Sequence, residues 1–357
     1  MILIDGSVLE GGGQILRMAL SCSALTGTPI KVHKIRAGRQ KGGLAAQHLK
    51  GVELLRDICN AKVTGASLGS CEIEFQPGAL KGGKYYADTQ TAGSVALLLQ
   101  VALPVAFFCN SSISLELKGG TNCEMAPQMD FVTEIFRPNL EKFGATFDFD
   151  LRKRGYFPKG GGHCIIDVKP IVRFNATDIC DFGEVESFFG WSYVAGTLPI
   201  KMANEMAEGA KAEIRKLGIN KSVNIEAYKE SAEVASGNSS GIILGCRTHA
   251  NCVLGGSALG SRKESCFDSG KRAATEIVNL VPSKACVDEH VQDQLIIYMA
   301  LANGISRIRT GPLTLHTKTA IHIAELITNV KFNVYEDGLT NIIECKGIGL
   351  ENQFLNK

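Results

Sequence analysis

Three segments of the chain carry residue types that handle phosphate groups. The first is EGGGQILR, residues 10–17, and the second is IRAGRQKGG, residues 35–43, which holds three cations within six residues. The third contains His316, just before a stretch with helical spacing. A carboxylate that can hold a divalent metal, clustered cations that can bind phosphates and a candidate nucleophilic imidazole together indicate nucleotide chemistry.

In the first segment, Glu10, Gln14 and Arg17 are spaced so that a continuous helix would place them on one face. Glu10 could hold a metal that bridges phosphate oxygens, and Arg17 could bind those oxygens at a helix start that favours anions. The ordinary alternative is a carboxylate that complements the helix dipole beside a solvated arginine. The spacing matches neither a P-loop nor the dinucleotide-binding fingerprint, so both interpretations stay open.

The second segment connects an expected strand to an expected helix. Arg36, Arg39 and Lys41 could clamp a phosphate or an RNA backbone, or form a surface charge cluster. His48 follows on the apolar face of the helix, where a partly buried structural histidine is the default. A third basic loop, residues 152–162 (RKRGYFPKGGG), combines cations with aromatics that could stack on bases, although a solvated turn explains it equally well.

His316 is expected at or just before a helix N-terminus, because apolar residues follow at positions 320, 323 and 327. The positive end of the helix dipole lowers the pKa of a histidine and favours the neutral imidazole that attacks phosphorus. His322 lies between apolar neighbours in the same helix and is expected to be structural. Asp293, in the helical pattern of residues 291–302, could orient an imidazole, support a metal or merely cap its helix.

Length and composition indicate a globular chain of about two domains. The 12 cysteines form no CxxC pair and no signal peptide is expected, which favours a reducing compartment, cytosol or nucleus. The net charge of +2 neither predicts nor excludes a nucleic-acid partner. The longest apolar stretch, residues 95–109, is too short to span a bilayer and is expected to be a buried helix.

A short strand, a Gly-Gly turn and an amphipathic helix follow one another four times. The expected strands at 1–4, 30–35, 73–75 and 113–117 lead to helices at 14–25, 44–59, 93–105 and 129–143. This repetition predicts an internally repeated α/β architecture. From about residue 180 the pattern changes to a charged helix at 201–217, strands at 223–228, 241–246 and 250–254, and a helix ending near 276–281. We interpret this stretch as an inserted domain.

Taken together, these motifs resemble the RNA 3′-terminal phosphate cyclase family. The likeness covers nearly the whole chain and rests on residues 5–17, 35–39 (IRAGR), 47–49 (QHL), 118–122 (KGGTN), 126–127, 154–162 and 293–295 (DQL). Residues 299–304 (MALANG) and 343–345 (IEC) also match animal members. The implied fold is α/β (α+β), with a catalytic domain of repeated βαβαββ modules at 1–179 plus 284–357. A smaller α/β domain at 180–283 is inserted into it.

The resemblance also implies a reaction of the ligase type, in which ATP drives conversion of an RNA 3′-phosphate to a 2′,3′-cyclic phosphate. A histidine takes AMP from ATP, the AMP passes to the RNA phosphate, and the ribose 2′-OH then displaces AMP. The implied ligands are ATP, a divalent metal (Mg²⁺ or Mn²⁺) and RNA with a 3′-phosphate end. No membrane partner is implied, the oligomeric state is left open, and the expected location is the nucleoplasm, with the cytoplasm as a second location.

Matching positions carry the family's residue roles over to this chain. The implied catalytic residues are the nucleophile His316 with Glu10, Arg17 and Asp293, and Glu10 is also the implied metal ligand. The implied nucleotide-binding residues are Gln100, Pro127, His290, Asp293, Gln294 and His316. The implied phosphate- and RNA-binding residues are Arg36, Arg39, Gln47 and His48. His290 departs from the family, which usually has a tyrosine against the base, and an imidazole stacks over less area.

Two other classes of function remain as alternatives. One is a non-catalytic cyclase-like protein of ribosome assembly, which would lack the nucleophilic histidine; the presence of His316, Glu10 and Arg17 argues against it. The other is a transferase of related fold that acts on phosphorylated sugars or shikimate. The basic loop at 36–41 fits all three classes.

Overall fold

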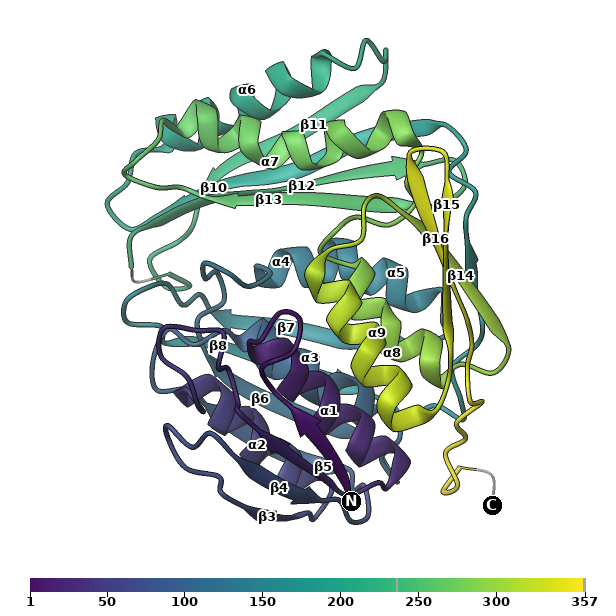
Figure 1. Ribbon diagram of the computed structural model, residues 1–357. Helices are drawn as coiled ribbons and strands as arrows, with labels where there is room; N and C mark the ends of the chain where they lie inside the picture. The colour runs from purple at the N-terminus through teal and green to yellow at the C-terminus, as the bar shows by residue number, and fades with distance from the viewer. Residues whose placement is uncertain (236, 356–357) are drawn as a thin grey trace.

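The computed structural model describes residues 1–235 and 237–355, and these residues form four sheets of four strands each (Figure 1). Three of the four sheets repeat one strand order. In each, the first strand pairs parallel with the second, the second antiparallel with the fourth, and the fourth antiparallel with the third. The expected α/β fold of repeated βαβαββ modules is therefore confirmed.

The first repeat contains β1 (Ile2–Asp5), α1 (Gly13–Thr26), β2 (Ile30–His33), α2 (Ala46–Ile58), β3 (Lys62–Thr64) and β4 (Ile73–Gln76). The second contains β5 (Gly83–Asp88), α3 (Val95–Ala106), β6 (Ile113–Gly119), β7 (Asp148–Lys153) and β8 (Gly162–Val168). Its second helical run comprises α4 (Met129–Phe131), the π-helical turn η1 (Val132–Phe136) and α5 (Arg137–Glu141). The third contains β9 (Asp178–Ile179), α8 (Gln292–Leu301), β14 (Ile305–Thr310), α9 (Leu315–Thr328), β15 (Phe332–Asp337) and β16 (Thr340–Lys346).

The fourth sheet lies between β9 and α8 in the chain. It comprises β10 (Val185–Ala195), β11 (Ser222–Lys229), β12 (Ser239–Thr248) and β13 (Val253–Leu259), with helices α6 (Ile200–Arg215) and α7 (Cys266–Leu280) and the 3₁₀ turn η2 (Val281–Ser283). Figure 1 shows α6 and α7 over one face of this sheet and α4 and α5 below the other. The division of the chain at residues 179/180 and 283/284 stays a prediction.

Contacts from the second repeat hold the lower face of that sheet. The Gln128 side chain, just before α4, donates hydrogen bonds to backbone carbonyls of β12 and β13, and Asn139 donates to the Val253 carbonyl at 3.0 Å. Both amides are buried, so each would be costly to leave unpaired. These bonds fix β12 and β13 relative to the repeats, and α7 packs against β13. Both β13 and α7 contribute to the cavity described below.

Most elements expected from the sequence are present, but one expected turn is wrong. Gly82-Gly83 does not lead into a helix; Gly83 begins β5, and α3 starts only after Ser94, whose hydroxyl accepts the Leu97 N–H. The sequence of β5 shows no clear alternation of apolar and polar residues, because its two tyrosines are adjacent. Both tyrosines are at least partly exposed in the structure. Helix α3 is buried nearly all round, as its apolar sequence predicts, and no helix within the described residues is long and apolar enough to cross a membrane.

Candidate active site

One cavity of about 680 Å³ gathers side chains from all three repeats and from the fourth sheet. Its volume lies in the range of small-molecule sites in proteins. The structure places on its wall every residue to which the resemblance assigns a role: Glu10, Arg17, Arg36, Arg39, Gln47, His48, Gln100, Pro127, His290, Asp293, Gln294 and His316. Lys41 of the second segment is not on this wall. These residues span more than 300 positions of the chain and meet only because the repeats fold onto one another.

Glu10 does not belong to helix α1, which corrects the expectation of one continuous helical face. Gly11 has a φ of +60°, and α1 begins only at Gly13, so Glu10 lies in the turn before the helix. Its carboxylate accepts the Gly12 N–H at 2.7 Å and forms an ion pair with Arg39. The carboxylate is nearly buried, with 6 % of the side chain exposed, and it faces the cavity.

A chain of side-chain hydrogen bonds connects Arg17 to Asp293. Arg17 donates to the Gln14 oxygen at 2.8 Å, and the Gln14 amide nitrogen donates to the Asp293 carboxylate at 2.8 Å. Burial raises the pKa of Asp293 to about 7, although the charge of Arg17 opposes this shift. Burial lowers the pKa of Arg17 to about 10, and its Nε has no hydrogen-bond partner. Arg17 is therefore a charged group with an unused donor beside the cavity.

His316 is the second residue of α9, as the sequence predicts. The hydroxyl of Thr314 caps this helix by accepting the Thr317 N–H at 3.1 Å. Partial burial lowers the pKa of His316; the charge of Glu10 opposes the shift, and those of Arg17 and Arg39 reinforce it. The side chain is solvent-exposed on the cavity wall. A neutral, accessible imidazole at this position can act as a nucleophile.

The loop between β2 and α2 brings its arginines to the cavity, as expected. Arg36, which has a φ of +56°, donates to the Gly43 carbonyl at 2.8 Å, and this bond holds the loop closed. His48 is buried, and burial together with the neighbouring arginines lowers its pKa to about 3. A Cβ at Gly13 would lie 2.5 Å from His48 Nε2, so only glycine lets this imidazole approach the start of α1.

Four further residues, for which the resemblance implies contact with the nucleoside, lie on another part of the wall. Gln100 comes from α3 and Pro127 from the segment before α4. Gln294 donates to the His290 carbonyl at 2.6 Å, and the His290 ring meets the buried Phe131 ring edge-on, with centroids 5.8 Å apart. The Phe131 ring thus contacts the His290 imidazole, and Gln294 holds the His290 backbone.

Two of the residues noted in the sequence behave differently in the structure. Arg154, in the third basic loop, is buried and forms ion pairs with Asp130 and Glu230, so it is not free to bind nucleic acid. His322 is exposed and does not pack between apolar neighbours, because its side chain falls on the outer face of α9. Cys59, Cys109 and Cys164 are buried free thiols.

Sequence reasoning missed the residues that hold the site together. Gln292 is fully buried in α8, and its oxygen accepts both the Thr314 N–H at 3.3 Å and the Thr317 hydroxyl at 2.8 Å, which anchors the start of α9. Thr319 accepts the Glu10 N–H at 3.2 Å. The one signal in the sequence was Gln292, a polar residue within an apolar helix. Its position in the sequence does not reveal which residues it bonds.

The comparisons with known proteins identify the family of this chain. The family model described as RNA 3′-terminal phosphate cyclase matches residues 8–334. The chain belongs to the RNA 3′-terminal phosphate cyclase family. It is 43 % identical over 356 residues to a protein of that name from Drosophila melanogaster, an alignment that covers 99 % of both chains. It is 37 % identical over 348 residues to the cyclase of Pyrobaculum aerophilum, covering 98 % of this chain and 99 % of that one. The Pyrococcus furiosus cyclase is 37 % identical over 348 residues, with 96 % and 99 % covered.

The family match covers the residues that form the cavity. The matched region begins after β1, ends within β15 and includes every residue of the wall named above. The family model is named for RNA 3′-terminal phosphate, and Arg17, Arg36 and Arg39 of this chain lie on the cavity wall.

Proposed function

We propose that this protein is an ATP-dependent RNA 3′-terminal phosphate cyclase that works through a covalent histidine–AMP. The observation that carries the proposal is the position of His316, which is exposed on a cavity that it shares with Glu10 and three arginines. This arrangement places a nucleophile beside groups that can bind a triphosphate.

In the first step, the neutral imidazole of His316 attacks the α-phosphorus of ATP, and pyrophosphate leaves. An oxygen of the RNA 3′-phosphate then attacks the same phosphorus, which frees the histidine and joins AMP to the RNA end. Finally, the neighbouring 2′-OH attacks the 3′-phosphorus and AMP leaves, which closes the cyclic phosphate. The lowered pKa of His316 supports this assignment because only the unprotonated nitrogen is nucleophilic.

Phosphate binding falls to Arg17, Arg36 and Arg39. The Arg17 Nε is a buried donor without a partner, which a phosphate oxygen would satisfy. Gly13 supports the assignment because a Cβ there would lie 2.8 Å from Arg17 Nη1, so any larger residue would displace the guanidinium. His48, with its pKa lowered to about 3, is neutral and can share a hydrogen bond with the RNA end.

A divalent metal fits Glu10, with Mg²⁺ and Mn²⁺ as the candidates. Mg²⁺ commonly uses one or two carboxylates together with substrate phosphates, and Glu10 offers one nearly buried carboxylate facing the cavity. When bound there, the metal would neutralise negative charge on the phosphates and so favour attack at phosphorus. Arg39 now occupies one oxygen of Glu10 and would have to release it.

The nucleoside would lie between Pro127 and His290, with Gln100, Asp293 and Gln294 on the same wall. We place the protein in the nucleoplasm, with the cytoplasm as a second location. The proposal is tested with an RNA that ends in a 3′-phosphate. With ATP, the end should become resistant to phosphatase and regain sensitivity after acid opens the cyclic phosphate. Conversion that does not depend on ATP, or that persists in His316→Ala, would refute the proposal.

A further inference from the structure

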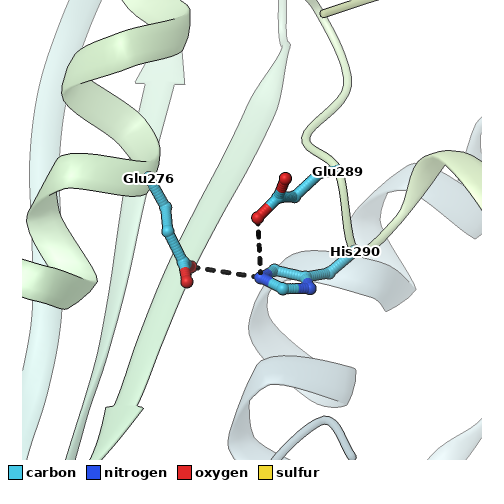
Figure 2. Close-up of side chains that lie close together, drawn as sticks. All are labelled: Glu276, Glu289 and His290. Atoms are coloured by element: carbon cyan, nitrogen blue, oxygen red, sulfur yellow. Dashed lines mark hydrogen bonds and ion pairs between the residues drawn. The ribbon is translucent and has the colours of Figure 1, made fainter. Parts of the chain in front are cut away.

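Glu276, Glu289 and His290 converge at one place on the cavity wall (Figure 2). The His290 Nε2 lies 3.2 Å from a Glu276 oxygen and 3.7 Å from a Glu289 oxygen. One ligand atom from each of the three side chains lies within 4.8 Å of the other two. Glu276 comes from α7, whereas Glu289 and His290 come from the connection before α8, so the cluster joins two elements that are distant in the chain.

The spacing of these atoms suits a small divalent cation. In a tetrahedral site with ligand bonds of about 2.0–2.1 Å, neighbouring ligand atoms are about 3.4 Å apart. The two distances from His290 lie on either side of that value. One imidazole nitrogen and two carboxylate oxygens form a mixed donor set that Zn²⁺ and its neighbours in the transition series accept, whereas Mg²⁺ and Ca²⁺ prefer oxygen ligands alone.

The backbone around the cluster holds its members in place. The Ser257 N–H of β13 donates to the Glu276 carboxylate at 3.1 Å. Asp288 is buried, and both of its carboxylate oxygens accept backbone hydrogen bonds. One accepts the backbone N–H of His290 at 2.9 Å, and the other accepts the backbone N–H of Gly255 at 2.9 Å. The Phe131 ring fixes the plane of the imidazole from the side. Such outer contacts orient ligands in metal sites, and none of them uses the His290 Nε2.

A proton is the competitor for this position. Burial lowers the pKa of His290, but the hydrogen bond and charge of Glu276, together with the charges of Asp288 and Glu289, outweigh it and raise that pKa to about 9. The same negative charges that stabilise an imidazolium stabilise a dication more strongly, because Coulomb energy grows with charge. A metal that binds at the His290 Nε2 must therefore displace the proton of the imidazolium.

We propose that Glu276, Glu289 and His290 bind a divalent transition metal of the Zn²⁺ type, with three protein ligands and a fourth position open to the cavity. This site is separate from the one proposed at Glu10, since Glu10 is not among its ligands. It does not depend on the cyclase mechanism, because the ligands would bind metal whether or not His316 forms a covalent intermediate.

Co²⁺ is the probe, because tetrahedral Co²⁺ absorbs visible light much more strongly than hexahydrated Co²⁺. Metal-free full-length protein should take up one equivalent with a tetrahedral spectrum that Zn²⁺ displaces. His290→Gln and Glu276→Gln should each abolish that spectrum and weaken Zn²⁺ binding at least tenfold in calorimetric titration. Glu10→Gln should keep both signals.

His163 provides a matched control, because within the described residues it also pairs with a glutamate, Glu116, at 3.0 Å but with no second carboxylate. His163→Gln should bind Co²⁺ and Zn²⁺ as the unaltered protein does. Near-ultraviolet circular dichroism checks that each variant is folded. If folded unaltered protein gives no tetrahedral spectrum, or one that shows thiolate-to-cobalt charge transfer and persists in His290→Gln, the proposal is wrong.

Discussion

The backbone N–H of Glu10 donates a 3.2 Å hydrogen bond to the hydroxyl of Thr319, 309 positions later in the chain. This bond connects the turn before α1 to the first turns of α9 and so sets the proposed metal ligand beside the proposed nucleophile. Thr319 is fully buried, and its hydroxyl also donates to the Leu315 carbonyl at 2.7 Å. The site is thus built across the junction of the first and third repeats.

Replacing Thr319 by valine should slow histidine–AMP formation and lower the free energy of unfolding by about 1 kcal/mol, because the Glu10 N–H loses its acceptor. Thr328→Val is the matched control. Thr328 lies in the same helix and makes the same bond to the carbonyl four residues earlier, but it has no such bond to Glu10. Equal rates of adenylylation for the two variants would show that the bond to Glu10 does not matter.

Gln292→Leu should destabilise the protein by about 2 kcal/mol, because the buried hydroxyl of Thr317 and the Thr314 N–H lose their acceptor. Urea denaturation measures this loss. We also expect slower labelling of His316, since these bonds anchor the start of its helix. Unchanged stability would mean that water replaces the amide without cost.

Substitutions at Glu10 and at Arg39 should change the metal concentration needed for adenylylation in opposite directions. Glu10→Gln removes the carboxylate, so the metal concentration for half-maximal adenylylation should rise at least tenfold. Arg39→Gln removes the cation that now occupies this carboxylate, so the same concentration should fall. Titrations of Mg²⁺ and Mn²⁺ at saturating ATP measure both. A fall for Glu10→Gln, or a rise for Arg39→Gln, would contradict the assignment of Glu10 as the ligand.

The buried Asp293 makes a prediction about pH. Its pKa is raised to about 7 in the folded protein, so the folded state holds the proton more tightly than the unfolded chain. The contribution of the protonated carboxyl to the free energy of unfolding is fully present below about pH 4 and is lost as pH rises through 7. Asp293→Asn should therefore be more stable than the unaltered protein at pH 8, by on the order of 2 kcal/mol, and show no such gain at pH 4. Urea unfolding at both values measures the difference, and a gain of equal size at both would exclude titration as the cause.

The sequence predicted the residues on the cavity wall better than it predicted the buried residues that hold them in position. Glu10, Arg17 and His316 stood out because charged or nucleophilic residues beside glycines and helix starts carry a chemical signal, and the structure brings them to one cavity. Gln292 and Thr319 carry no such signal, because their roles exist only through partners that the tertiary fold supplies. Glu10 was assigned to the helix because spacing alone does not reveal the left-handed turn at Gly11.

The same limit applies to the fold. Repeated Gly-Gly turns predicted repeated modules, and three sheets with one strand order confirm them. Several strands were not expected from the residues themselves, among them β5 and β10. Strand β5 has mixed exposure, and β10 lies at the start of a stretch without the Gly-Gly turn and helix. Glu276 also escaped notice, since only the packing of α7 against β13 brings it to His290.

The covalent histidine–AMP is the central claim, and ATP labelled at the α-phosphate tests it directly. The protein is incubated with labelled ATP and a divalent metal and then resolved by denaturing electrophoresis, beside His316→Ala and the control His322→Ala. We expect an acid-labile label on the unaltered protein and on His322→Ala, whose side chain is exposed on the same helix, and none on His316→Ala. Label that persists in His316→Ala, or its absence from folded unaltered protein with either metal, would contradict the mechanism and favour a non-catalytic role.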